Sequence, residues 1–431
     1  MESLDGKVIY QVFVRNYQKE GNFKSVKKDL DRIKSLGVDI LYLMPINEIG
    51  KASRKGTYGS PYAIKDYYAI SKDLGTKKDL VELIKATHEK GMKIILDMVF
   101  NHTSPDNDLT TKHPDFYYLK EGVPSHRIAD WSDVIDLNVE KIETQEYLID
   151  VLRYYVSLGF DGFRFDVASI IPLEFFARAR LALGNDIIFF AESVSKDFKV
   201  YLKKMHYYYE EDEYLPPTFD ILYNYNYLDD FKHYLETRDE EYLRSVMRII
   251  NKENVINQEV IRSNGLENHD LDRLASKLSR KELINFTTMF ISIRGSAFIY
   301  AGGEYGFKHR PDLFEKDPID WTIKDEELCE YIKELIELKK EFGEIETQYI
   351  EEIGQLLVYK ITLRNKEGLE RKFIVNLSDR TILLEQLMED LYDDDLLTII
   401  DGMIKNGDIV LDHPLIFTFS LEDKTKEAVQ S

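Results

Sequence analysis

Two acidic residues near the middle of the chain carry the strongest chemical signal. Asp166 ends the run GFDGFRFD, and Glu192 ends the apolar run IIFFAE about one strand–helix–strand unit later. Because such a unit leads to the next strand of a parallel sheet, the two carboxyl groups are expected to face each other. Carboxylates about 5–5.5 Å apart across a glycosidic bond act as nucleophile and as acid and base. The spacing therefore predicts Asp166 and Glu192 as a catalytic pair.

Arg164 lies two residues before Asp166 in the same apolar run. In a strand this spacing puts both side chains on one face, and a buried ion pair needs a reason beyond packing. A structural salt bridge is the simple interpretation; the functional one is that Arg164 keeps Asp166 ionised and oriented. Apolar residues before Glu192 would raise the pKa of its carboxyl group, as a general acid requires.

Further polar side chains follow other apolar runs. If the runs are parallel barrel strands, these residues meet at the carboxyl-end rim, where barrel enzymes place their active sites. Carboxylates from four different strands at one rim are hard to explain as packing. The residues concerned are Asp97 at the end of KIILD, Asn101 and His102 just beyond it, and Asn268, His269 and Asp270 after VIRSNGLE.

The elements that must position these residues alternate in type along the chain. Short apolar runs predict eight strands, and a helical pattern or long connection follows each one. This alternation predicts an α/β fold, a (β/α)8 barrel. A doubly wound sheet is the alternative, but no glycine-rich phosphate turn follows the first strand. The expected strands are 7–15, 39–45, 92–100, 158–167, 185–194, 219–226, 260–268 and 296–303.

Three parts of the chain are expected. The catalytic barrel comprises residues 1–102 and 141–343, interrupted by a short insertion, 103–140, after the third strand. A connection of that length is usually functional. Residues 344–431 are expected to form a C-terminal antiparallel β domain, because short alternating runs such as KFIVNL, LLTII and LIFTFSL read as strands.

Composition limits the partners. Among 431 residues, 57 Lys and Arg stand against 78 Asp and Glu, a net charge of −21, which argues against nucleic acid and anionic membranes as partners. One cysteine excludes an internal disulfide framework and a cysteine zinc cluster. No apolar run is long enough to span a membrane, and the N-terminus lacks a signal-peptide pattern. A cytoplasmic location is expected, although prior removal of a signal peptide would leave the same pattern. The composition does not indicate an oligomeric state.

Four motifs together resemble the signature regions of the α-amylase family of glycoside hydrolases. They are DMVFNH (97–102), GFRFD (162–166), AES around Glu192 and ENHD (267–270). DLN (136–138), SPYAIKDYY (60–68) and IYAGGEYGF (299–307) resemble further regions of that family. The order and spacing agree from about residue 7 to 322, so the resemblance covers the whole expected barrel.

The resemblance implies roles for individual residues. Asp166 matches the nucleophile, Glu192 the general acid/base, and Asp270 the third carboxylate, which grips sugar hydroxyls and stabilises the transition state. Arg164 matches the partner of the nucleophile, and Asn101 a calcium ligand of many members. The implied substrate-binding residues are Tyr62, as a stacking ring, with Asp97, His102, Arg164, Asn268 and His269.

The implied activity is retaining hydrolysis of α-glucosidic bonds, most simply α-1,4 bonds of maltooligosaccharides or α-glucans. The chemistry would need no cofactor, and a structural calcium at Asn101 is an expectation. Ser169 and Ile170 stand where many members carry a Lys-His pair, which argues against the subsites of an endo-acting starch amylase. A 4-α-glucanotransferase, a disaccharide phosphorylase or isomerase, and a non-catalytic member are the alternatives; the last is disfavoured because all three carboxylates are present.

Overall fold

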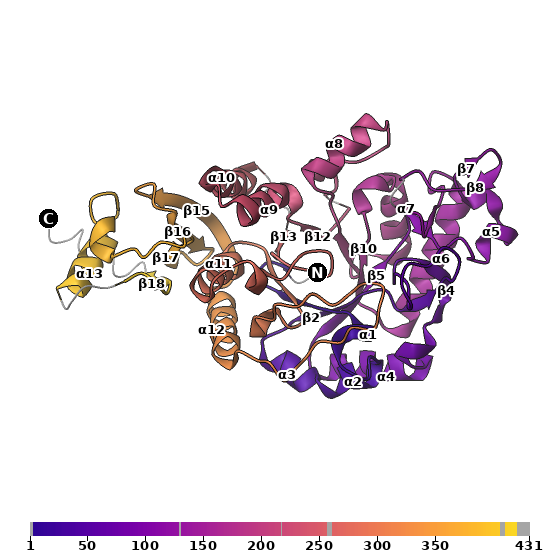
Figure 1. The fold of residues 1–431 in the computed structure, drawn as a ribbon, viewed down its shortest axis with the longest axis horizontal. Coiled ribbons are helices and arrows are strands. Elements are labelled where there is room, and N and C mark those ends of the chain that lie inside the picture. Colours follow the sequence, from indigo (N-terminus) through magenta and orange to yellow (C-terminus); the bar gives the residue numbers. More distant parts are fainter. Residues whose placement is uncertain (1–2, 129–130, 217, 257–260, 406–409, 420–431) are drawn as a thin grey trace.

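A closed barrel of eight parallel strands forms the centre of the molecule (Figure 1). The computed structural model describes residues 3–128, 131–216, 218–256, 261–405 and 410–419. The barrel confirms the predicted (β/α)8 fold. Within the described residues, no helix has the length and apolar character needed to cross a bilayer. Around the barrel the strands are β1 (Val8–Val12), β2 (Ile40–Leu43), β5 (Lys93–Met98), β10 (Gly162–Phe165), β11 (Ile188–Ala191), β12 (Ile221–Tyr223), β13 (Ile261–Asn264) and β14 (Ser296–Tyr300).

Helices follow the strands and cover the barrel from outside. Residues 23–35 form two helices in place of one, because the backbone leaves the helical region at Asp29. Gly159 ends α6 in a left-handed conformation, with φ of 107°. The helices of the barrel are α1 (Val14–Tyr17), α2 (Phe23–Lys28), α3 (Leu30–Ser35), α4 (Lys77–Glu89), α6 (Ile142–Leu158), α7 (Leu173–Leu183), α8 (Lys196–Lys204), α9 (Leu228–Thr237), α10 (Glu240–Ile256), α11 (Arg280–Ser292) and α12 (Glu326–Phe342).

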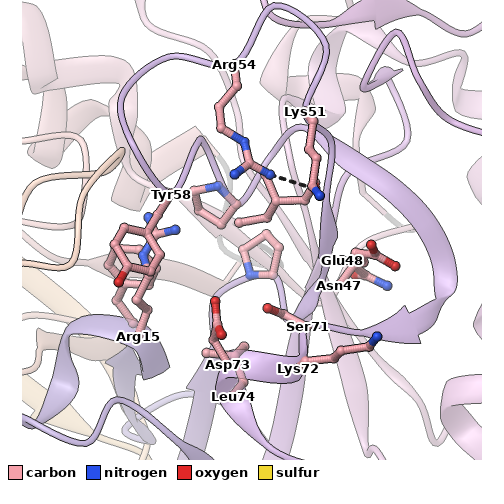
Figure 2. A pocket seen from close by; sticks show the side chains of 14 residues that line it. Arg15, Asn47, Glu48, Lys51, Arg54, Tyr58, Ser71, Lys72, Asp73 and Leu74 are labelled. Atoms are coloured by element: carbon pink, nitrogen blue, oxygen red, sulfur yellow. Dashed lines mark hydrogen bonds between the residues drawn. The ribbon is translucent and has the colours of Figure 1, made fainter.

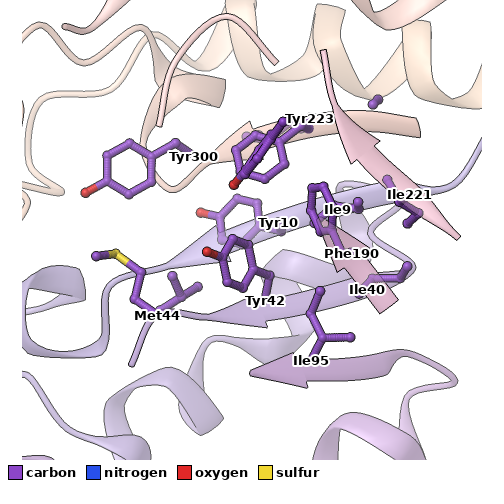
Figure 3. Close-up of a cluster of buried hydrophobic side chains, with 14 of the residues drawn as sticks. Ile9, Tyr10, Ile40, Tyr42, Met44, Ile95, Phe190, Ile221, Tyr223 and Tyr300 are labelled. Atoms are coloured by element: carbon purple, nitrogen blue, oxygen red, sulfur yellow. The ribbon is translucent and has the colours of Figure 1, made fainter. Parts of the chain in front are cut away.

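Side chains fill the inside of the barrel in layers. Isoleucines from several strands, including Ile40 and Ile95, lie beside the ring of Tyr42 (Figure 3). The ring of Phe190 lies 6.3 Å from Tyr42 and 4.7 Å from Tyr223, between ring centres. All these side chains are buried. The interior is thus apolar and aromatic directly below the rim where the polar residues lie.

The connections at the rim have structure of their own. The hairpin of β3 (Asn47–Ile49) and β4 (Ile64–Ile70) carries the loop that contains Tyr62. In the insertion, β6 (His102–Thr103) pairs with β9 (Ile135–Asp136), so that its two ends are joined. The insertion also contains α5 (Leu109–Lys112) and the hairpin of β7 (Leu119–Lys120) and β8 (Val123–Pro124).

An antiparallel sheet follows the barrel and confirms the predicted C-terminal β fold. Its strands, in order, are β15 (Ile345–Ile353), β16 (Val358–Asn365), β17 (Glu370–Asn376) and β18 (Leu415–Phe419). The strand expected at LLTII is wrong: these residues lie in helix α13 (Asp394–Ile404). Leu396 and Ile400 are four residues apart and both buried, and Asp393 caps the helix, so helical periodicity prevails. Residues 420–431 lie outside the described part.

Strands β10 and β11 approach each other closely because Gly162 has no side chain. A Cβ atom at this position would lie 2.4 Å from the carbonyl oxygen of Ile188 on β11. Real Cβ atoms do not come so near, so any larger residue must push the two strands apart. These strands carry Arg164 and lead into Asp166 and Glu192, and Gly162 therefore sets the geometry of the predicted catalytic pair.

We expect Gly162→Ala to lower the free energy of unfolding by about 2 kcal/mol, because overpacking a buried site costs about 1–3 kcal/mol. Thermal and urea unfolding measure the change. Gly402→Ala, at an exposed site on α13 where a Cβ would meet no atom within 4 Å, serves as the control. It should leave stability unchanged or slightly raised. Equal stability of Gly162→Ala and the parent protein would contradict the close approach.

Candidate active site

Arg164 is the centre of the site. It is fully buried on β10 and contacts three carboxylates at once. Its Nη1 donates to Oδ1 of Asp97 at 2.8 Å and to Oδ1 of Asp166 at 3.0 Å. Its Nη2 lies 2.8 Å from Oε1 of Glu192, an ion pair without the alignment of a hydrogen bond. One guanidinium therefore holds Asp166 and Glu192 next to each other, directly after the adjacent strands β10 and β11.

Val167 bends the chain directly after Asp166. Its φ and ψ of 40° and 43° lie in the left-handed region, which is unfavourable for a β-branched residue. The bend turns its N–H toward Oε2 of Glu192, at 2.7 Å. Strained backbone of this kind persists where the surrounding structure over-determines it, and it is concentrated at active sites. Here the bend allows the segment Asp166–Val167 to supply one carboxylate of the pair and to bind the other, Glu192, through a backbone N–H.

Asp97 is fully buried, and its second oxygen is also occupied. Oδ2 accepts hydrogen bonds from the hydroxyls of Tyr42, at 2.6 Å, and Tyr62, at 2.9 Å. Asp97 therefore has no free oxygen for a substrate in this arrangement and braces Arg164 and Tyr62. Tyr62 itself comes from the loop between β3 and β4, and its ring stacks on that of His269 with centres 5.3 Å apart.

His269 connects the loop after β13 with strand β1 and with the loop between β3 and β4. Its Nε2 lies 2.6 Å from the hydroxyl of Tyr62 and 2.9 Å from Oδ2 of Asp270. The amide nitrogen of Gln11 on β1 lies 2.9 Å from Nδ1. With Gln11 donating, a neutral His269 carries its proton on Nε2, facing Tyr62 and Asp270. The side chain of Asp270 is half exposed and is thus the member of the cluster most open to a ligand.

His102 and Asn101 lie at the base of the insertion. The ring of His102 is buried, with its centre 5.3 Å from that of Trp131, and its Nδ1 lies 3.1 Å from the amide nitrogen of Asn101. Calcium binds six to eight oxygens, several of them from carboxylates. The nearby Asp133 and Asp136 are paired with Lys55 and Arg127, and the described residues contain no metal-binding cluster of acidic, histidine or cysteine side chains. These donors do not fit a calcium site at Asn101.

Asn268 supports the loop after β13. Its Oδ1 accepts from the backbone N–H of Asp270 at 2.8 Å, and its amide donates to the hydroxyl of Tyr225 at 2.6 Å. The contacts described here connect Tyr62, Asp97, Arg164, Asp166, Glu192, His269 and Asp270 in one cluster, whereas His102, Asn101 and Asn268 lie in the loops around it. The catalytic and binding roles of these residues stay predictions.

Sequence reasoning missed three residues that hold the cluster in place, Gln11, Tyr42 and Val167. Gln11 is a polar residue within the apolar run KVIYQVFVR, and this break in the pattern was a usable signal. Tyr42 looks like an ordinary core tyrosine, and nothing in the sequence marks its bond to Asp97. Val167 gives no signal at all, because its left-handed conformation contradicts the preference of its type.

Comparison with known proteins now decides the family. The family profile described as the catalytic domain of alpha amylase matches residues 9–132 and 115–346, which includes every member of the cluster. The chain belongs to the α-amylase family. It is accordingly a glycoside hydrolase, and the parallel barrel with its C-terminal sheet is the fold of that family.

Solved structures and curated sequences agree with this assignment. A crystal structure of an alpha-amylase from Lactobacillus plantarum is 33% identical, with a TM-score of 0.85 over 96% of this chain and 99% of that one. A maltogenic alpha-amylase from Thermotoga neapolitana is 30% identical, with a TM-score of 0.77 over 88% and 87% of the two chains. Alpha-amylase 3 of Dictyoglomus thermophilum is 25% identical over 73% of this chain, and a Bacillus cyclomaltodextrinase 24% over 76%. This chain spans 67% and 60% of the lengths of those two relatives.

Burial and mutual repulsion change the acidity of this family member's central carboxylates. Burial, and then the charge of Glu192, raise the pKa of Asp166 well above its usual value, against the opposing effect of Arg164. Burial also raises the pKa of Glu192. Desolvation acts in the same direction on Asp270, but His269, Arg164 and Arg310 more than offset it and lower its pKa. Asp97, Asp166 and Glu192 all contact the single cation Arg164. The pair formed by Asp166 and Glu192 therefore tends to keep one proton.

We therefore expect Asp166→Asn to stabilise the fold at neutral pH, because burial and the charge of Glu192 disfavour an ionised carboxylate at this position. A carboxyl group whose pKa is raised by folding stabilises fully below its unfolded pKa, near 4, and loses that contribution as pH rises through the folded pKa. The neutral amide avoids this loss, so the advantage should shrink as pH falls toward 4. Unfolding midpoints at pH 7 and pH 4.5 measure it.

Asp220→Asn is the matched control, because Asp220 is paired with Arg180 at 2.7 Å beside the start of β12, outside the cluster. It should bring no gain at pH 7. A lower midpoint for Asp166→Asn than for the parent protein at pH 7 would show that the three carboxylates are not in excess over Arg164.

Proposed function

We propose that the chain is a retaining enzyme that hydrolyses α-glucosidic bonds, in particular α-1,4 bonds of maltooligosaccharides and short α-glucans. The observation that carries this proposal is the pair Asp166 and Glu192 on one buried guanidinium. Inverting enzymes need room for a water molecule between their two carboxyl groups, whereas retaining enzymes place them about 5–5.5 Å apart. Two carboxylates that contact the same Arg164 favour the shorter separation.

In the proposed mechanism, Asp166 attacks the anomeric carbon of the bound sugar while Glu192 protonates the departing oxygen. In the reactive state the one proton that the pair retains lies on Glu192, because Arg164 donates a hydrogen bond to Asp166 and favours its ionised form against the effect of burial, and Glu192 donates this proton to the departing oxygen. A covalent glycosyl-enzyme forms on Asp166. Glu192, now ionised, deprotonates a water molecule that attacks the same carbon from the opposite side, and Asp166 is released with the configuration retained. The side chains of the cluster carry these steps without a cofactor.

The surrounding residues fit the recognition of one sugar ring. Asp270 is open to a ligand and would accept hydrogen bonds from two hydroxyl groups of the sugar. Its negative charge would also stabilise a positively charged transition state. The stacked rings of Tyr62 and His269 give that sugar an apolar face and two polar atoms. Burial lowers the pKa of His102 to about 4, so it would act as a neutral hydrogen-bonding group at pH 7. Relatives described as cyclomaltodextrinases and maltogenic amylases support α-glucan substrates.

The decisive experiment combines one variant with one control. Asp166→Asn should lower the turnover of maltotriose at least a thousandfold, because the amide cannot form the glycosyl-enzyme. Asp220→Asn makes the same chemical change in another Asp–Arg pair and should keep near-parental turnover. Folding of both variants is checked by circular dichroism. Near-parental activity of Asp166→Asn would refute the assignment.

The products of maltotriose distinguish the closest alternatives. Proton NMR of the first products should show the α-anomer before mutarotation, as a double displacement at one carbon requires. Chromatography should show glucose and maltose. A first product in the β-configuration would exclude the retaining mechanism, and products longer than maltotriose would indicate glucanotransferase activity in place of hydrolysis.

A further inference from the structure

A second pocket lies behind the loop that carries Tyr62 (Figure 2). It has a volume of about 200 Å³ and lies between this loop, the β3–β4 hairpin and the short helix η1 (Lys72–Leu74). Tyr58, Pro45 and Pro61 form part of its wall. Its described lining contains no member of the catalytic cluster, so the pocket is a site of its own.

Basic side chains dominate the charge of this pocket. Four of them line it, Arg15, Lys51, Arg54 and Lys72, and none of the four forms an ion pair within the described part of the chain. Such a concentration of unpaired positive charge is unexpected in a protein with a net charge of −21. A local positive potential in an acidic protein attracts small anions.

The acidic residues of the lining do not cancel this charge. There are two, Glu48 and Asp73, and Glu48 is already paired with Lys65 at 3.3 Å. The nearby Lys55 also has an acidic partner, Asp133, at 2.8 Å. Lys65 and Lys55 beside the pocket thus form ion pairs with carboxylates, whereas the four basic residues of the lining form none within the described part of the chain.

Arg15 is the buried part of the site. Only 5% of its surface is exposed. Its Nη1 donates to the carbonyl of Gly59 at 3.1 Å and its Nη2 to that of Leu313 at 2.5 Å, while the buried Nε has no partner. A guanidinium has five N–H donors, so three remain available. Burial lowers the pKa of Arg15 to about 10, and the charges of Asp312, Glu315 and Asp73 offset this effect only in part.

Arg54 is held in place on another side of the pocket. Its three nitrogens donate to the carbonyls of Gly50, Thr57 and Ile49, at 2.8, 3.2 and 3.1 Å. Two N–H groups remain. In Figure 2 the charged ends of Arg54 and Lys51 lie on one side of the pocket, and the polar groups of Ser71 and Asp73 lie on the other. A fixed guanidinium loses little freedom when it binds a ligand, which favours affinity.

We propose that this pocket binds a phosphate group, either as free inorganic phosphate or on a small sugar. Phosphate offers several acceptor oxygens and a double negative charge, and guanidinium groups bind it in a bidentate manner. The pocket supplies the complementary set: two partly used guanidiniums, two flexible ammonium groups and the hydroxyl of Ser71. A neutral sugar would leave the excess positive charge of the lining uncompensated.

Isothermal titration calorimetry of the full chain at low ionic strength tests the proposal with inorganic phosphate, glucose 6-phosphate and glucose. Lys51 and Lys72 are exposed, so Lys51→Gln with Lys72→Gln should fold normally. The double variant should bind phosphate at least tenfold more weakly than the parent. Lys120→Gln with Lys232→Gln removes the same charge from exposed positions on β7 and α9 and should leave the affinity unchanged.

Equal affinities for phosphate and glucose 6-phosphate would identify the free ion as sufficient, and tighter binding of the sugar phosphate would identify the sugar as part of the ligand. The proposal is overturned if the parent does not bind phosphate, or if both double variants weaken binding equally. Turnover of maltotriose should be the same in the parent and in Lys51→Gln with Lys72→Gln, so this test is independent of the proposed glucosidase function.

Discussion

A single buried cation determines the arrangement of the active site. Arg164 contacts Asp97, Asp166 and Glu192, and a buried arginine without such partners would cost several kcal/mol. The reverse also holds, because three carboxylates near one arginine carry excess negative charge that no other described cation contacts directly. The cluster thus combines a structural need for Arg164 with a chemical need for a pair that holds one proton. The need to compensate the buried Arg164 explains why carboxylates surround it, and the need for a proton on the catalytic pair explains why there are more carboxylates than one arginine can neutralise.

The rest of the site serves to hold this cluster at the rim. The aromatic rings of Phe190 and Tyr223 form an apolar floor, and the guanidinium carbon of Arg164 lies 5.5 Å from the ring centre of Tyr223. An apolar floor strengthens every charge interaction above it. At the edge of the cluster, the hydroxyl of Tyr62 donates a hydrogen bond to Asp97 and thereby attaches the loop between β3 and β4 to the barrel. That loop is fixed in turn by Arg15 and by Arg54, so the second pocket and the active site share a structural element.

The sequence predicted those features that follow from strand periodicity. Arg164 and Asp166 two residues apart, and Glu192 one unit later, led to the pair because alternation and parallel order are simple geometric rules. The β3–β4 hairpin and helix α13 were not found, since short apolar segments carry little information about type. Tyr42 could not be found either: its hydroxyl reaches Asp97 across the barrel, and such long-range contacts leave no local pattern.

This difference has a physical origin in how the two parts of the site are built. The charges that would break the bond are attached to strands, whose backbone conformation and spacing are fixed by the hydrogen bonds of the barrel. Other groups in or beside the cluster, Trp131, Asp270 and Arg310, lie on loops, whose conformation depends on contacts between distant segments. The spacing of a few residues at the ends of strands is therefore enough to predict the type of reaction. We expect the preference for chain length or acceptor to depend on the packing of these loops, which the spacing of strand residues does not predict.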